Sequence, residues 1–80
     1  MNKNVIMHES LIRNYYEVSY ERWELSKNGQ EYGETIEFLL NGYLTPFWEN
    51  GYVSDRFYEN ISKEINDDLN RLVENGEYYD

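Results

Sequence analysis

The sequence of 80 residues has no cysteine, no alanine and only one proline. Without cysteine the chain forms no disulfide and no cysteine-based zinc site, so a reducing compartment suits it. Its longest uninterrupted apolar runs are three residues, whereas a membrane-spanning helix needs about 20. The N-terminal residues lack the pattern of a secretory signal peptide. We therefore expect a single small acidic domain over residues 1 to 80, soluble and cytoplasmic.

Basic residues are also scarce. Lys and Arg number 7 against 16 Asp and Glu, which gives a net charge of −9. A field of this sign repels nucleic-acid phosphates and anionic lipids, and it attracts basic surfaces. The expected partner is therefore a basic protein, and basic surfaces belong most often to proteins that bind nucleic acids. We expect no direct contact with nucleic acid and none with a membrane.

Asn and Tyr, by contrast, are abundant, and Asn-Gly pairs stand at residues 28–29, 41–42, 50–51 and 75–76. An Asn-Gly pair fills a two-residue hairpin turn or ends a helix, because glycine adopts positive φ without steric cost. The apolar periodicity around the pairs favours helices. We expect at least three of the four pairs to be helix terminators.

The firmest predicted helix covers residues 54 to 74, where apolar residues recur at i, i+3, i+4 and i+7. Ser54 is its expected N-cap, and the Asn-Gly pair at 75–76 is its expected stop. The same pattern in shorter form predicts a helix near residues 34 to 41. Thr45 as a cap before Pro46 then predicts one helical turn, closed by the pair at 50–51.

Residues 10 to 27 admit two interpretations. As a helix, their apolar side chains spread over about 220° of its surface, which is unusually wide. As a strand, Tyr16, Val18 and Tyr20 alternate, and a β-hairpin turns around Asn28-Gly29 and packs on two helices in an α+β fold. We favour the helix, so the predicted fold is mainly α: a small bundle of three helices plus a short helical turn. Residues 1 to 8 give little signal, and we expect them to fray.

Motifs for catalysis and metal binding are scarce. His8 is the only histidine, and it lacks the second histidine of a helical zinc motif. Residues 66 to 77 match several ligand positions of a calcium-binding loop, but Arg71 stands where that loop needs glycine. We expect no enzymatic activity, no metal site and no cofactor.

Acidic residues form the strongest candidate site for a partner. Residues 28 to 55 hold five acids and no Lys or Arg. In a helix, the acids of residues 17 to 24 share one narrow face with carboxylates about one turn apart, comparable to neighbouring phosphates on a nucleic-acid strand. The predicted acidic face comprises Glu17, Glu21, Glu24, Glu31, Glu34 and Glu37. The alternative is a solvated face that keeps a small domain soluble.

Aromatic side chains are too numerous for a core of this size, at 18% of the residues. Tyr and Trp are enriched in the energetic centres of protein–protein interfaces. The predicted aromatic part of the interface comprises Tyr20, Trp23, Tyr32 and Trp48. For each of them, core packing is the alternative.

The composition is rich in aromatic residues and Asn, which suggests an AT-rich coding source. In this composition, in its small size and in its acidity, the chain is similar to small inhibitors that phages and plasmids carry against host defence enzymes. Anti-restriction and anti-CRISPR proteins are among these inhibitors. The similarity is one of character and assigns no role to a residue. It implies a non-enzymatic inhibitor or regulator in a bacterial host, a nucleic-acid mimic that acts on a basic nucleic-acid-binding protein. The other hypothesis is a structural or assembly module that self-associates, as a homodimer, through the helix 54 to 74.

Overall fold

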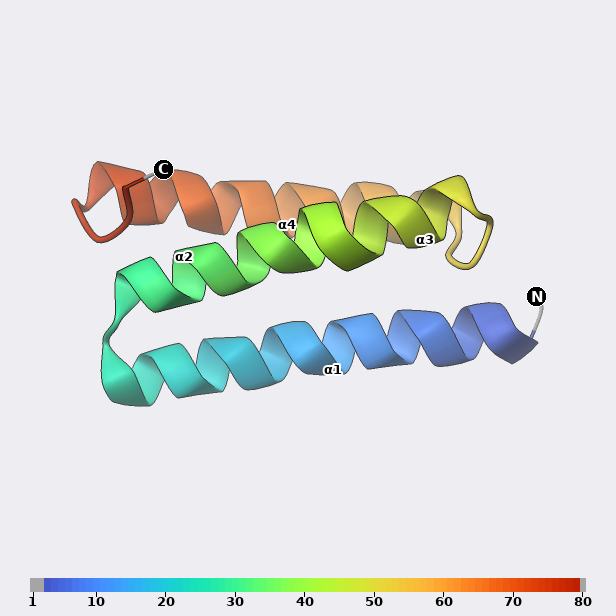
Figure 1. Ribbon diagram of the computed structural model, residues 1–80, viewed down its shortest axis with the longest axis horizontal. Helices are drawn as coiled ribbons and strands as arrows, with labels where there is room; N and C mark the ends of the chain where they lie inside the picture. Colours follow the sequence, from blue (N-terminus) through green and yellow to red (C-terminus); the bar gives the residue numbers. More distant parts are fainter. Residues whose placement is uncertain (1–2, 80) are drawn as a thin grey trace.

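Helices account for nearly the whole chain in the computed structural model, which describes residues 3 to 79. In chain order they are α1 (Lys3–Ser26), α2 (Gly29–Phe38), a π-helix η1 (Leu39–Leu44), α3 (Thr45–Glu49) and α4 (Asp55–Glu74). No strand occurs among the described residues, so the mainly-α prediction is confirmed and the hairpin alternative is wrong. Figure 1 shows three rods side by side, of which α2, η1 and α3 together form the middle one.

The first rod is longer than the sequence indicated. α1 begins at Lys3, whereas the predicted helix began at residue 10. Of the segment expected to fray, residues 3 to 8 therefore belong to this helix, and residues 1 and 2 lie outside the described part. Ile12 and Tyr16 of α1 are buried in the core against the other two rods.

The middle rod contradicts the prediction that a helix stops at Asn41-Gly42, because both residues lie inside η1. Thr45 is no N-cap either, since Leu44 before it is already in the α conformation. The Thr45 N–H donates to the Leu40 carbonyl, five residues back. This wider turn stands directly before Pro46, which has no N–H to donate, so the change of register lets the rod continue past the proline.

Residues 28 and 29 start a helix and do not end one. The Asn28 side chain accepts a hydrogen bond from the Glu31 N–H at 3.0 Å and caps α2. The left-handed residue after α1 is Lys27, with a φ of 57°. Gly29 packs closely on the C-terminal tail, residues 75 to 79, so that a Cβ added at Gly29 would lie 2.6 Å from the Glu77 Cβ.

Only the last two Asn-Gly pairs end helices, with φ of 77° at Gly51 and 71° at Gly76. The expectation of at least three terminators is therefore wrong. Local sequence could not separate the four pairs, because Gly29 is packed against Glu77 of the distant C-terminal tail and Gly42 lies inside a helix whose neighbours Leu39 and Leu44 are buried in the core.

The helix predicted over residues 54 to 74 is confirmed as α4. Ser54 caps it by accepting the Phe57 N–H at 3.1 Å. At the other end the Gly76 and Glu77 N–H groups donate to carbonyls of the last turn, in the arrangement of a Schellman motif. The apolar stripe of α4 is buried, with Ile61 and Ile65 each 0% exposed.

The core lies along the line where the three rods meet. Its buried members are Ile12, Tyr16, Tyr32, Ile36, Leu39, Leu44, Val53, Ile61, Ile65, Leu72 and Tyr78. Tyr78 comes from the C-terminal tail, and its ring would overlap a Cβ at Gly33, only 2.4 Å away. The tail is thus a structural part of the bundle.

Candidate protein-binding surface

An acidic groove runs between α1 and α4, the two outer rods. Its lining residues are Arg13, Tyr16, Glu17, Tyr20, Glu21, Glu24, Glu64, Asp67, Asp68 and Arg71, and its volume is about 540 Å³. Six carboxylates and two guanidinium groups leave the groove with a net charge of −4. Both helices contribute three acids each, so the charge is shared between elements that are far apart in the sequence.

The floor of the acidic groove is a hydrogen-bonded cluster around Asp68. Tyr16 and Tyr32 both donate their hydroxyls to its Oδ2 atom, the latter at 3.0 Å. Arg71 lies 3.4 Å from the other carboxylate oxygen. Burial raises the pKa of Tyr16 and Tyr32 far above the usual value, and the neighbouring carboxylate raises it further. Both hydroxyls therefore stay protonated and hold the Asp68 side chain in place.

An ion pair between the outer rods lies at one rim of the acidic groove. Arg13 of α1 contacts Glu64 of α4 at 3.0 Å. Both side chains are more than a third exposed, so the pair adds little to stability. It marks where the acid-bearing faces of α1 and α4 lie side by side.

The structure brings together only half of the predicted acidic face. Glu17, Glu21 and Glu24 are exposed and line the acidic groove. Glu31, Glu34 and Glu37 are all on α2 and none of them lines it.

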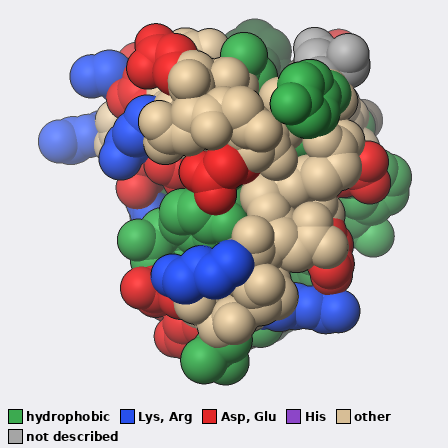
Figure 2. Space-filling view, turned by 90° about the vertical axis from the view of Figure 1, so that its left-hand side faces the viewer, with side chains coloured by type: hydrophobic (Ala, Val, Ile, Leu, Met, Phe, Trp, Pro, Cys, Tyr) green, Lys and Arg blue, Asp and Glu red, His purple; other side chains and the backbone are tan. Residues whose placement is uncertain are grey.

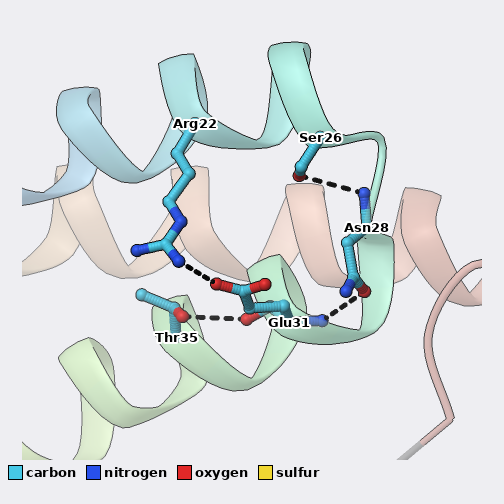
Figure 3. Close-up of polar contacts among 5 residues, drawn as sticks. All are labelled: Arg22, Ser26, Asn28, Glu31 and Thr35. Carbon is cyan, nitrogen blue, oxygen red and sulfur yellow. Dashed lines mark hydrogen bonds and ion pairs between the residues drawn. The ribbon is translucent and has the colours of Figure 1, made fainter.

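Each acid of α2 has a local partner. Glu31 of α2 forms an ion pair with Arg22 of α1, with 3.0 Å between the paired atoms, and Figure 3 shows the two side chains directed toward each other. Glu34 accepts from Gln30 at 3.0 Å, and Glu37 accepts from the Tyr78 hydroxyl. The contacts of Glu31 and Glu37 join α2 to α1 and to the C-terminal tail, whereas that of Glu34 lies within α2.

The predicted aromatic residues are also divided. Tyr20 lines the acidic groove and is 42% exposed. Tyr32 is buried, and Trp23 stacks on it with ring centroids 5.0 Å apart. Trp48 stacks on Tyr58 and donates to Asp55 at 2.7 Å, outside the acidic groove. Only Tyr20 therefore stands beside the acids.

Glu64, Asp67 and Asp68 of α4 line the acidic groove but were not among the predicted site residues. Their position beside the apolar stripe of α4 gave one signal, because residues flanking a buried stripe lie at the rim of the next helix. Local sequence did not show which helix would lie there.

Figure 2 views the end of the bundle where α1 meets α2, and acidic groups are spread over it next to exposed apolar surface.

The described part of the chain has neither a candidate metal site nor a candidate membrane-spanning helix. Residues 3 to 79 contain no group of three or more His, Asp or Glu side chains that could hold a metal ion. None of the helices there combines the length and the apolar character that crossing a membrane requires.

Comparison of the chain with protein-family models, with curated proteins and with solved structures found no match.

Proposed function

We propose that the protein is a non-enzymatic inhibitor or regulator that captures a basic, nucleic-acid-binding protein in its acidic groove. The observation that carries the proposal is the density of charge there. The lining residues extend from Arg13 to Glu24 on α1 and from Glu64 to Arg71 on α4, and the longer of these spans rises about 16.5 Å along its helix. A net charge of −4 over that length is one charge per roughly 4.1 Å. Nucleic acid carries one charge per ~3.4 Å on one strand and per ~1.7 Å on a duplex.

Two rows of acids on parallel rods resemble two rows of phosphates in more than charge density. The cluster around Asp68 holds the floor in position, and the Arg13–Glu64 pair lies at one rim. A preorganised surface loses less side-chain entropy on binding, which favours affinity. Tyr20 adds an exposed ring beside the acids, of the kind found at the centres of interfaces.

The setting that fits this chemistry is the cytoplasm of a bacterial host. A restriction or CRISPR enzyme has a basic channel for nucleic acid, and a small acidic protein from a phage or plasmid would occupy it. The support is the similarity of character together with the acidic groove. The apolar stripe of α4 does not support the self-association hypothesis for that helix, because Ile61, Ile65 and Leu72 are buried inside the chain's own core.

The test is affinity capture from the lysate of a low-GC bacterium, with three baits at low and at high salt. The baits are the natural protein, a groove variant with Glu17, Glu21 and Glu24 all changed to Lys, and a control variant with Glu49, Glu59 and Glu74 all changed to Lys. The three control acids are exposed and outside the acidic groove, so both variants have the same net charge.

The proposal predicts that the natural protein and the control variant retain one basic nucleic-acid-binding protein at low salt and lose it at high salt. The groove variant should retain it at neither. Equal retention by the groove and control variants would contradict the proposal and leave the acids a solvating role.

A further inference from the structure

The outer surface of α1 has a second apolar stripe that the bundle leaves uncovered. It consists of Leu11, Tyr15, Val18, Arg22 and Leu25, which we term the outer stripe. The intervals of four, three, four and three residues are those of a helix that packs along another helix. The three aliphatic members are 53 to 89% exposed. In contrast, Ile12 and Tyr16, on the adjacent face of α1, are buried.

The π-helix η1 extends this apolar surface. Phe38 and Tyr43 are five residues apart, so an ordinary α-helix would place them about 140° apart around its axis. The i to i+5 turns of η1 bring them onto one side, with ring centroids 5.4 Å apart. The Tyr43 ring also lies 6.4 Å from the Tyr15 ring of α1. Segments of π-helix are often found at functional sites.

A shallow groove of about 390 Å³ lies between α1 and η1, beside the rings of Tyr15 and Tyr43. Eight residues line it, among them Leu11, Val18 and Tyr43, and none of the eight is charged. Arg22, the one charged member of the outer stripe, is already paired with Glu31. The outer stripe and this groove therefore carry no unpaired acid, although the chain as a whole has a net charge of −9.

These features select a second copy of the chain as the occupant. Two chains of charge −9 repel each other, so they can associate only through a face from which the acids are absent. The outer stripe extends seven residues to each side of Val18, from Leu11 to Leu25. A two-fold axis near Val18 would therefore overlay two antiparallel stripes over their full length, as a self-complementary interface requires.

The available area is close to what such a pair needs. Tyr15, Phe38 and Tyr43 are 43 to 58% exposed. At about 200 Å² for each aromatic side chain, they leave roughly 300 Å² per chain uncovered. The aliphatic members of the outer stripe add to this area. Two copies together thus approach the lower limit of about 1,200 Å² for a stable interface.

We propose that the protein forms a two-fold symmetric homodimer in which the outer stripe and the rings of Phe38 and Tyr43 pack against the same surface of a second copy. The acidic groove lies on another side of α1 and stays open in each copy. The inference does not depend on the proposed function, because it concerns a different surface and a different kind of contact.

Light scattering after gel filtration, over a range of concentrations and at low and high salt, tests the proposal. The natural protein should elute at twice the chain mass of 9.8 kDa. High salt should favour this dimer, because it screens the repulsion between the two acidic chains. It should weaken capture of a basic partner, so the two proposals respond to salt in opposite directions.

Leu11→Glu and Val18→Glu should each shift the protein to the mass of one chain. Both positions are exposed and glutamate is a good helix former, so circular dichroism should show an unchanged fold. Asn60→Glu is the matched control, an acid added at an exposed position of α4, and it should leave the dimer intact. A single-chain mass for the natural protein at all concentrations and in high salt would overturn the proposal. A dimer unaffected by both stripe variants would also overturn it.

Discussion

Two helices of similar length, α1 and α4, use their surfaces in different ways. α4 has one apolar stripe, and its central residues Ile61 and Ile65 are fully buried. Both helices line the acidic groove, but α1, which buries Ile12 and Tyr16, also presents the outer stripe on another side. The wide apolar surface that made α1 hard to interpret is therefore two separate stripes. The single stripe of α4 stabilises the fold. The additional exposed apolar face of α1 is available to contact partners.

The largest expected effect contrasts a buried position of α4 with an exposed position of α1. Ile65→Ala removes a side chain with 0% exposure, so it should lower the free energy of unfolding by about 2–5 kcal/mol. Leu11→Ala, at 59% exposure, should change it by less than about 0.5 kcal/mol at concentrations where the chain is monomeric. Urea denaturation followed by circular dichroism measures both. Equal losses would break the comparison between the two helices.

The next effect concerns the contact between the two helices. Asp68→Ala leaves the Tyr16 and Tyr32 hydroxyls without their acceptor. A buried donor without a partner costs about 1–3 kcal/mol, and these two hydroxyls are only partly buried, so each costs toward the low end and the free energy of unfolding should fall by about 2–4 kcal/mol. Asp67→Ala is the matched control, because Asp67 is exposed, and it should be nearly neutral. The same urea titration distinguishes them, and a neutral Asp68→Ala would show that the cluster does not join α1 to α4.

The same cluster predicts how stability depends on pH. The pKa values of Tyr16 and Tyr32 are raised in the folded chain, so folding favours their protonated forms. Their contribution to the free energy of unfolding is complete below the ordinary tyrosine pKa of about 10 and is lost as the pH rises above it. In that range each of the two tyrosines should lower the free energy of unfolding by about 1.4 kcal/mol per pH unit.

Urea midpoints measured between pH 7 and pH 11 test this dependence. A variant with both Tyr16→Phe and Tyr32→Phe should show a shallower fall above pH 10. Tyr52→Phe, at an exposed position, should keep the full slope. An unchanged slope in the double variant would exclude the cluster as the source.

The smallest effect distinguishes the ends of the two helices. α4 is followed by Gly76 with a φ of 71°, whereas α1 is followed by Lys27 with a φ of 57°. Gly76→Ala should destabilise the protein by about 1 kcal/mol, because a residue with a side chain is strained at this positive φ. The cause is the backbone conformation and not a clash, since no atom lies within 4 Å of a Cβ added there. Lys27→Gly should relieve similar strain and raise the melting temperature slightly. A drop in melting temperature for Lys27→Gly would mean that the Lys27 contact with the Trp23 ring outweighs that strain.

Sequence alone predicted α4 almost completely, because its cap, its stripe and its terminal glycine all agreed. It failed for Asn41-Gly42 and Thr45-Pro46, where each local signal indicated a boundary. There the packing of the middle rod between α1 and α4 keeps the chain helical, and the π-turns of η1 accommodate the proline. The local signals were real, but burial of Leu39 and Leu44 determined the outcome.

For the candidate site, sequence predicted the acids of α1 but not those of α4. The face shared by Glu17, Glu21 and Glu24 follows from helical spacing alone. Its union with the acids of α4 depends on contacts between residues 16 and 68 and between 13 and 64, which are more than 50 positions apart. The burial of Tyr32 depends on the same long-range packing.

The most direct test of the account is competition for the captured partner. A labelled oligonucleotide is bound to the basic protein recovered in the capture experiment, and its displacement is measured as this protein is added at several salt concentrations. If the acidic groove mimics nucleic acid, the natural protein and the control variant with Glu49, Glu59 and Glu74 changed to Lys should displace the oligonucleotide, and less of it as salt rises. The groove variant with Glu17, Glu21 and Glu24 changed to Lys should displace nothing. Equal displacement by the two variants would contradict the claim that the acidic groove mimics nucleic acid.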